Sequence, residues 1–395
     1  MDGPSFGRPA GFPRGTTASM QKIDFDLTAT LDRVAEWQGS DLHLKHGSPP
    51  LVRVNGDLVP LDDVRVLEPA DTEQVLWEML EDPARVAEFE SEHEVDFSYA
   101  HDGANPARFR VNAFRQLGGI TLVCRAVPER IRALGELGLP PAISELAREE
   151  RGIVLITGST GSGKTTTLAA MVDQINSERP RHIVTIEDPI EFVHHDRRSV
   201  INQREVGSHT TSFARALRRV LRQDPDVILI GEMRDEETVR TALSAAETGH
   251  LVLSTLHTLD ATESVNRIVD LFPPRAQQQA RLMLASTLRG IVSQRLVRTA
   301  DGRGRVVSCE VLRMTGRVRD MIMRPEETSR LHEAIAEGVY YGMQTFDQAL
   351  HQHVDAGRIS MDDALLAASN PHDFKLLVAA NGQPANSVEQ VISAQ

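Results

Sequence analysis

Eight residues near the middle of the chain have the composition and spacing of a phosphate-binding loop. Gly158-Ser-Thr-Gly-Ser-Gly-Lys-Thr165 matches the pattern G-x-x-x-x-G-K-[ST], with an apolar run before it and a helical pattern after it. The glycines let the backbone curl so that its N–H groups face a β-phosphate, and the helix N-terminus adds the positive end of its dipole. In such loops Lys164 reaches the β- and γ-phosphates and the Thr165 hydroxyl binds Mg²⁺. We therefore predict a nucleoside-triphosphate site formed by Gly158, Ser159, Thr160, Gly161, Ser162, Gly163, Lys164, Thr165 and Thr166.

Carboxylates follow two further apolar runs, at positions that chemistry on a bound nucleotide requires. One run ends in Glu232, the place of the metal-associated carboxylate in nucleoside triphosphatases, so Glu232 is expected to hold Mg²⁺ through water. The other leads into Glu187, Asp188 and Glu191. Hydrolysis needs an acceptor that orients and deprotonates the attacking water, and the carboxyl ends of parallel strands face the ligand crevice. Any of these three can be that base; an acidic loop without a catalytic role is the alternative.

Two histidines flank another apolar run, Gly249-His-Leu-Val-Leu-Ser-Thr-Leu-His257. His257 comes directly after the run, where a sensor of the γ-phosphate would lie, and His250 comes directly before it. Both are candidates for that role. A purely structural role is the alternative for each of them.

The elements that must position these residues alternate along the chain. Near-continuous apolar strands separated by helices predict a parallel sheet covered on both faces. The predicted strands are 153–157, 182–186, 227–230 and 251–254; the helices between them are 164–177, 211–223 and 235–248. Beyond them we predict helices at 262–270, 274–297, 317–337, 344–356 and 361–369.

The region before this pattern predicts a compact α+β domain with a largely antiparallel sheet. Strands are expected at 40–44, 108–114 and 120–125, and a helix at 70–91. A hairpin is expected around Asn55-Gly56, because Asn-Gly accepts the positive φ angles of a type I′ turn.

Composition excludes several classes of protein. The 395 residues carry 43 basic and 56 acidic side chains, a net charge of −13, which argues against a general nucleic-acid binder. No apolar run approaches the roughly 20 residues that span a bilayer. Two cysteines, Cys124 and Cys309, cannot form a disulfide framework or a four-cysteine zinc site. A soluble protein of a reducing compartment is expected.

Several motifs in fixed order resemble one family, the secretion-superfamily ATPases of type II secretion and type IV pili, and most closely its pilus-retraction class. The resemblance extends from about residue 23 to about 368. It rests on Gly161-Ser-Gly-Lys-Thr-Thr-Thr-Leu-Ala-Ala170, Thr185-Ile-Glu-Asp-Pro-Ile-Glu-Phe-Val-His194, Asn202-Gln-Arg-Glu-Val206, Gly231-Glu-Met-Arg-Asp235, Ala246-Glu-Thr-Gly-His250, Thr255-Leu-His-Thr258 and Tyr341-Gly-Met-Gln-Thr-Phe-Asp-Gln348.

The resemblance implies an α/β fold, with a RecA-like P-loop core and a smaller PAS-like α+β N-terminal domain, assembled as a ring-shaped homo-hexamer that hydrolyses ATP with Mg²⁺. It implies an inner-membrane pilus platform protein as partner, no nucleic acid, and a cytoplasmic location at the inner face of the membrane. The expected segments are a disordered leader 1–21, the N-terminal domain 22–130, a linker 131–151, the ATPase domain with its helical C-terminal part 152–370, and a tail 371–395.

Particular roles also follow from the resemblance. Glu191 matches the catalytic glutamate, with Glu187 supporting it, and Glu232 matches the Walker B glutamate. His250 and His257 match the family's paired histidines. Two phosphate-contacting arginines of the N-terminal domain match Arg110 and Arg125.

Retraction is favoured over extension because the chain has no room for an extra N-terminal domain or a four-cysteine zinc module. The retraction class carries the motif Ala-Ile-Arg-Asn-Leu-Ile-Arg-Glu near its C-terminus. The most similar segment here is Arg317-Val-Arg-Asp-Met-Ile-Met-Arg324, in which the central residues are replaced conservatively and the flanking residues differ. An accessory paralogue, a motor of another pilus machine, a pilus-assembly or type II secretion ATPase, and a RecA-like nucleic-acid translocase are the alternatives.

Overall fold

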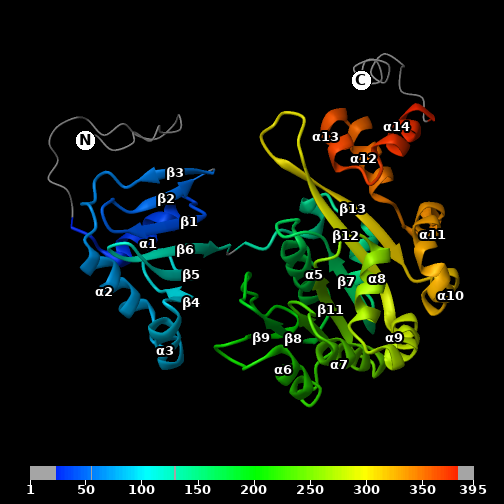
Figure 1. Ribbon diagram of the computed structural model, residues 1–395, viewed down its shortest axis with the longest axis horizontal. Helices are drawn as coiled ribbons and strands as arrows, with labels where there is room; N and C mark the ends of the chain where they lie inside the picture. Colours follow the sequence, from blue (N-terminus) through cyan, green and yellow to red (C-terminus); the bar gives the residue numbers. More distant parts are fainter. Residues whose placement is uncertain (1–23, 55, 129, 381–395) are drawn as a thin grey trace. The chain divides into compact units, whose positions relative to one another are not determined.

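The computed structural model describes residues 24–54, 56–128 and 130–380 in two compact units (Figure 1). One unit comprises the chain up to Arg130 together with Glu191–Val193, and the other comprises Ile131–Ile190 and the chain from His194 onward. The expected leader, residue 55 of the predicted turn and residues 381–395 lie outside the described residues.

The first unit is built on an antiparallel sheet whose described strands run in the order β3-β2-β1-β6-β5-β4. The strands predicted at 40–44, 108–114 and 120–125 are confirmed, and so is the hairpin, in which Val54 is paired with Asp57. The strand at Glu94–His101 (β4) was not predicted. The bounds are β1 (Asp41–Lys45), β2 (Leu51–Val54), β3 (Asp57–Pro60), β4 (Glu94–His101), β5 (Ala107–Gln116) and β6 (Gly119–Val127).

One face of this sheet packs against helices α1 (Leu27–Glu36), α2 (Pro69–Met79) and α3 (Pro83–Glu92). Alternate strand residues, such as Phe109, Val111 and Ala113, are fully buried in that core, because successive side chains of a strand point to opposite faces. The single helix predicted at 70–91 is wrong. It is divided into two because Asp82 caps a new helix that begins at Pro83, where a proline needs no N–H donor.

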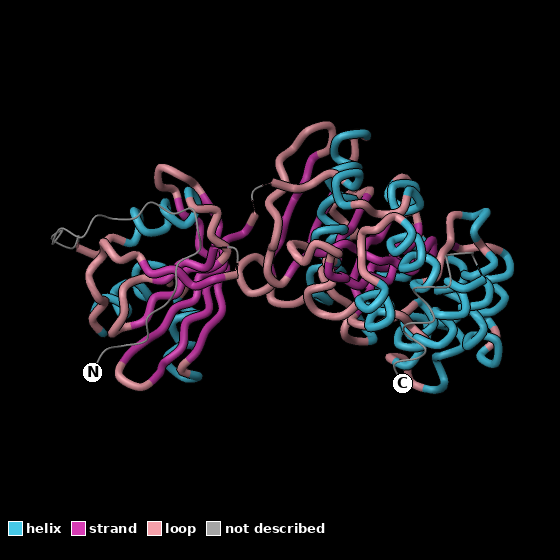
Figure 2. Tube along the Cα trace, turned by 90° about the horizontal axis from the view of Figure 1, so that it is seen from above, coloured by secondary structure: helices cyan, strands magenta, loops and turns pink. Residues whose placement is uncertain are grey.

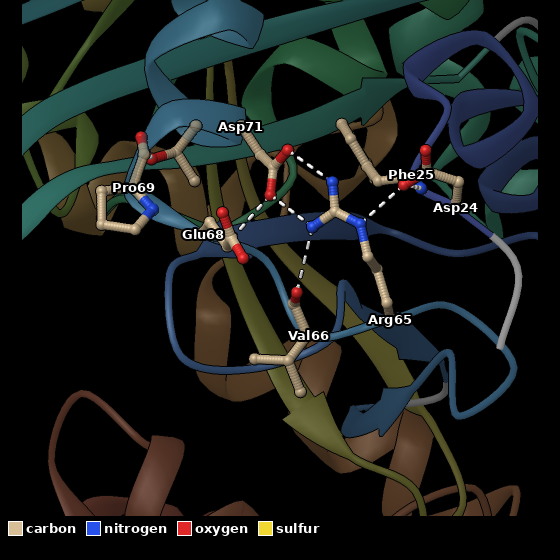
Figure 3. A network of polar contacts seen from close by, with 8 residues as sticks. Asp24, Phe25, Arg65, Val66, Glu68, Pro69 and Asp71 are labelled. Carbon is tan, nitrogen blue, oxygen red and sulfur yellow. Dashed lines mark hydrogen bonds and ion pairs between the residues drawn. The ribbon is translucent and has the colours of Figure 1, made fainter.

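Arg65 fixes the start of α2 (Figure 3). Its guanidinium donates to both oxygens of Asp71, at 2.6 and 2.7 Å, and its Nε donates to Asp24 Oδ1 at 2.6 Å. Asp71 also accepts the backbone N–H of Glu68, the residue that caps the helix. The hydrogen bond from Arg65 holds the pKa of Asp71 below its usual value. The chain therefore enters α2 through a network that depends on the planar fork of an arginine.

The second unit is built on a mostly parallel sheet with helices around it (Figure 2). The order of the described strands is β13-β12-β7-β11-β10-β8-β9, in which only β13 is antiparallel to its neighbour. The four strands predicted from the apolar runs are confirmed. The bounds are β7 (Gly152–Thr157), β8 (His182–Glu187), β9 (Val200–Glu205), β10 (Val227–Ile230), β11 (Leu251–Leu256), β12 (Leu288–Arg298) and β13 (Arg305–Arg313).

Both faces of this sheet are covered, which explains the near-continuous apolar strands. In β7, Ile153 and Leu155 belong to one core and Val154 and Ile156 to the other. The first core is closed by α6 (Phe213–Val220), α7 (Glu236–Glu247), α8 (Ala261–Asp270), α9 (Pro274–Thr287), α10 (Gly316–Met323) and α11 (Leu331–Glu337). The second is closed by η1 (Leu134–Leu137), α4 (Pro141–Ala147) and α5 (Lys164–Glu178).

Four parts of the expected layout are wrong in the second unit. The single helix predicted at 317–337 is divided, because α10 ends at Met323 and the 3-10 helix η2 (Pro325–Arg330) separates it from α11. The helix predicted at 274–297 ends at Thr287, and the chain continues as strand β12 between β7 and β13. The segment predicted as a linker contains η1 and α4, which pack on the core. The segment predicted as a tail from 371 begins with helix α14 (Pro371–Ala380), whose Phe374 is fully buried in a small core with residues of α12 (Phe346–Asp355) and α13 (Met361–Ala367).

Within the described ranges, none of the helices is both long and apolar enough to span a membrane.

Candidate functional site

The phosphate-binding loop lies where the sequence places it, between the carboxyl end of β7 and the start of α5. Gly158 has φ +138°, and a Cβ atom there would lie 2.5 Å from the backbone oxygen of Gln294, so only glycine fits. Gly163 caps α5 in the left-handed conformation, with φ +93°. The loop therefore presents the N-terminus of α5, with its free N–H groups and positive dipole end, to an anion.

Lys164 and Ser162 line the inside of this loop. The Lys164 ammonium group is buried and donates to the carbonyl oxygens of Gly158 and Ser159, at 2.8 and 2.9 Å. Ser162 is 3% exposed, and its hydroxyl has no hydrogen-bond partner among the described residues. A buried hydroxyl without a partner is costly, which fits a site built to bind a phosphate oxygen.

Strand β12 supports the loop from the neighbouring position in the sheet. Thr157 Oγ1 donates to Ser293 Oγ at 2.9 Å, and Gln294 Nε2 donates to Thr167 Oγ1 at 2.8 Å. Both partners on β12 are buried. The segment that was predicted to be helical thus anchors the strand before the loop and the helix after it. Sequence reasoning missed these two residues.

Glu232 and His257 meet at the same edge of the sheet as the loop, because β10 and β11 are parallel to β7. Glu232 Oε2 lies 2.8 Å from the Arg234 guanidinium and 3.4 Å from His257 Nε2. Thr255 Oγ1 donates to the Gly231 carbonyl at 2.6 Å, which fixes the turn that carries Glu232. The structure therefore brings together two predicted site residues that are 25 positions apart in the chain.

Arg234 and His257 stabilise the negative charge on Glu232. Burial raises the pKa of Glu232, but the hydrogen bond from Arg234 and the nearby His257 more than offset this, so the pKa lies below its usual value. Glu232 is therefore ionised at neutral pH. Arg234 belongs to the family motif at 231–235 but is not among the predicted site residues; its position two residues after Glu232 is the signal that could have found it.

Glu187, at the end of β8, is buried and held by two donors on one oxygen. Thr185 Oγ1 donates to Glu187 Oε1 at 2.5 Å and Gln203 Nε2 donates to the same atom at 3.1 Å. Asp188 follows it in the chain and is exposed. The carboxylate of Glu187 is thus fixed in orientation by its neighbours on β8 and β9.

His250 is not brought to the phosphate-loop edge. It precedes β11, and its neighbour Leu251 is paired with Gly152 at the start of β7. The six residues of β11 separate it from His257 by roughly 20 Å. His250 Nδ1 lies 2.9 Å from the Ala245 carbonyl oxygen. Within one subunit, His250 therefore does not lie beside Glu232 and His257.

Arg110 and Arg125 lie side by side in the first unit. They are Cα partners in the ladder between β5 and β6. Arg125 Nε donates to Asp41 Oδ1 at 2.8 Å, and Asp41 is buried. Burial raises the pKa of Asp41, but the hydrogen bonds from Arg125 and Ser40 more than offset it, so its pKa lies below the usual value. Arg110 is exposed. Two arginines that are Cα partners on neighbouring strands place positive charge on one face of the sheet, which suits an anionic partner.

The donors at the loop edge fit Mg²⁺. Thr165 lies in the first turn of α5, and the ionised Glu232 lies at the same sheet edge, so the available ligands are a hydroxyl and a carboxylate. Mg²⁺ takes such oxygen ligands, one or two from the protein with the rest from phosphates and water. Among the described residues, no cluster of three or more His, Cys, Asp or Glu could hold a metal ion.

Residues 100–365 match the family described as Type II/IV secretion system protein. The chain is 44% identical to the type IV pilus retraction ATPase PilT of Pseudomonas aeruginosa, over 88% of this chain and all of that protein. The chain belongs to the type II/IV secretion ATPase family. It is also 46% identical to a twitching motility protein of Neisseria gonorrhoeae, over 81% of this chain and 84% of that one.

A solved structure extends the family match to the fold. The crystal structure of the pilus retraction motor PilT with bound ADP superposes with a TM-score of 0.81 and 42% identity, over 88% of this chain and 98% of that one. Membership of the secretion ATPase family and this likeness confirm the predicted fold class, a RecA-like core with a smaller N-terminal domain. They also establish the chain as a nucleotide-binding ATPase.

Proposed function

We propose that this chain is the hexameric, Mg²⁺-dependent ATPase that powers retraction of a type IV pilus. The observation that carries the proposal is the match to a retraction ATPase over its whole length, in a chain whose phosphate loop and Glu232–Arg234–His257 cluster are intact. Retraction by such a motor serves twitching motility.

The proposed chemistry is hydrolysis of the γ-phosphate of ATP. The loop amides and Lys164 bind the β- and γ-phosphates, and Thr165 and Glu232 hold Mg²⁺, which neutralises phosphate charge when bound. Glu191 accepts a proton from the attacking water and Glu187 supports it. His257, beside Glu232, senses the γ-phosphate, and Arg110 and Arg125 neutralise the charge of the transferred group, in the same subunit or in a neighbour.

Loss of the γ-phosphate changes the charge that these arginines meet, and this change drives rigid-body motion of the N-terminal domain. Repeated around a homo-hexamer, the motion would work on the inner-membrane platform protein of the pilus machine. The chain would then act in the cytoplasm, at the inner face of the membrane.

A second candidate is an accessory ATPase of the same machine, because the segment at 317–324 departs from the retraction motif at its flanks. In α10 the conservative positions Val318, Met321 and Ile322 are buried, whereas the flanking Arg317 is half exposed and pairs with Glu337. The positions that match the retraction motif conservatively are therefore buried residues of α10, whereas the flanking position Arg317, which departs from the motif, lies at the surface.

Deletion of the gene in its host tests the proposal. We expect excess surface pili that fail to retract, restored by the wild-type chain and not by Lys164→Ala. Normal retraction in the deletant would favour the accessory role. Loss of surface pili altogether would refute retraction and point to pilus assembly.

A further inference from the structure

The segment that carries Glu191 is tied to β9 at two points. The backbone N–H of Ile190 donates to Glu205 Oε2 at 3.0 Å, and the backbone N–H of His194 donates to Gln203 Oε1 at 2.8 Å. Only three residues, Glu191–Val193, separate the two tied positions. Such a short stretch has little freedom once both of its ends are fixed.

Both ties come from one face of one strand. Gln203 and Glu205 alternate along β9, so their side chains project on the same side. Glu205 is 3% exposed, and its second oxygen accepts from Ser208 Oγ at 3.2 Å. A buried carboxylate that accepts a backbone N–H is a strong, charge-assisted hydrogen bond. Glu205 is therefore built into the fold as an anchor for the chain at Ile190.

Gln203 links the two glutamates of the proposed chemistry. Its amide oxygen accepts from His194, while its amide nitrogen donates to Glu187 Oε1 at 3.1 Å. A displacement of the amide group would disturb both the orientation of Glu187 and the end of the Glu191 segment. An amide is the side chain that can donate on one side and accept on the other.

We propose that Gln203 and Glu205 are positioning residues for ATP hydrolysis, which hold the chain on both sides of Glu191. The inference rests on the proposed function, because it needs Glu191 to act as the base. In-line attack tolerates little misplacement: an error of about 1 Å can cost roughly 100-fold in rate. The proposed role of both residues involves no direct contact with the nucleotide.

The test compares turnover with nucleotide binding in the full-length ATPase. Gln203→Met removes the hydrogen bonds to His194 and Glu187 at nearly constant side-chain volume. Glu205→Leu removes the hydrogen bond from the Ile190 N–H. We expect kcat to fall about tenfold or more in each. The KM for ATP and the Kd for a fluorescent ADP analogue should stay within about twofold, because the phosphate loop is untouched.

Two further variants separate positioning from folding. Glu205→Gln keeps an oxygen that can accept from Ile190, so it should retain most of the wild-type kcat. Asn202→Ala is the matched control: it removes a hydrogen bond from the opposite face of β9, where Asn202 Nδ2 and His182 Nε2 lie 2.8 Å apart. Its kcat should equal that of the wild type.

The outcomes distinguish the inference from the proposed function. If Glu191→Gln is inactive while Gln203→Met and Glu205→Leu turn over normally, the positioning role is wrong and the base survives. If the two variants lose nucleotide binding and melting temperature together with kcat, their role is structural and the inference is again overturned. If Glu191→Gln itself turns over normally, the proposed base is wrong, and the positioning role falls with it.

Discussion

Glu310 provides a pH test of the second unit that is independent of catalysis. It lies on β13, is 6% exposed, and its Oε1 accepts the N–H of Ala261, the first residue of α8, at 2.8 Å. Burial raises the pKa of Glu310 from its usual 4.5 to about 7. Asp260 and Asp347 also raise this pKa, whereas the Ala261 hydrogen bond and Arg295 lower it.

The sign of the effect follows from proton binding. Between about pH 4.5 and 7 the folded chain keeps a proton on Glu310 that the unfolded chain has released. The free energy of unfolding therefore falls as the pH rises through this window. A rise in pKa from 4.5 to about 7 corresponds to about 3 kcal/mol. This contribution is fully present below pH 4.5 and is lost above about pH 7.

Glu310→Gln removes this dependence, because glutamine keeps an oxygen for the Ala261 N–H and never ionises. Near pH 5 the variant should melt close to the wild type. At pH 8 it should be more stable by up to about 3 kcal/mol, or roughly 5–10 °C in Tm for a unit of this size. The assay is calorimetry of both proteins at pH 5, 6, 7 and 8.

Glu247→Gln is the matched control, since Glu247 is an exposed carboxylate at the end of α7. Its Tm shows the effect of removing one carboxylate elsewhere in the unit, and the Glu310→Gln difference is compared with it at each pH. A Glu310→Gln difference from the wild type that stays constant with pH, or a variant that is less stable than the wild type at pH 8, would refute the reasoning.

Four further substitutions test other parts of the structure. Lys164→Ala should abolish ATP turnover and weaken binding of a fluorescent ADP analogue at least tenfold, because the loop loses its cation; unchanged turnover would exclude Lys164 from the site. Gly158→Ala should abolish nucleotide binding, because the Cβ meets backbone and the φ is strained as well. Gly161→Ala should weaken it less, because its φ of +78° is strained but a Cβ there meets nothing within 4 Å; equal effects in equilibrium titrations would contradict the steric argument. Phe374→Ala should destabilise the second unit by about 3–5 kcal/mol in denaturant unfolding, and no loss would mean that α14 is not part of the core.

Local patterns account for what was predicted correctly. The phosphate loop, the four strands β7, β8, β10 and β11, and the hairpin at β2 and β3 each depend on neighbouring residues: glycines at fixed spacing, an apolar run, an Asn-Gly pair. Helix α14 and the division between α2 and α3 depend on more. Phe374 becomes a core residue only when α12 and α13 supply its neighbours, and these lie outside its own segment of the chain.

By itself the sequence determined the phosphate-binding loop, because the spacing of the glycines and Lys164 is contained in eight consecutive residues. Only the tertiary structure decided that residues 288–298 are a strand. Their Leu, Arg and Gln side chains suit a helix, but the hydrogen bonds to β7 and β13 come from residues far away in the chain. It also decided which histidine lies beside Glu232: parallel strands carry His257 to the edge that holds Glu232 and leave His250 at the other edge. A strand has two ends, and only pairing with its neighbours determines which end meets the phosphate loop.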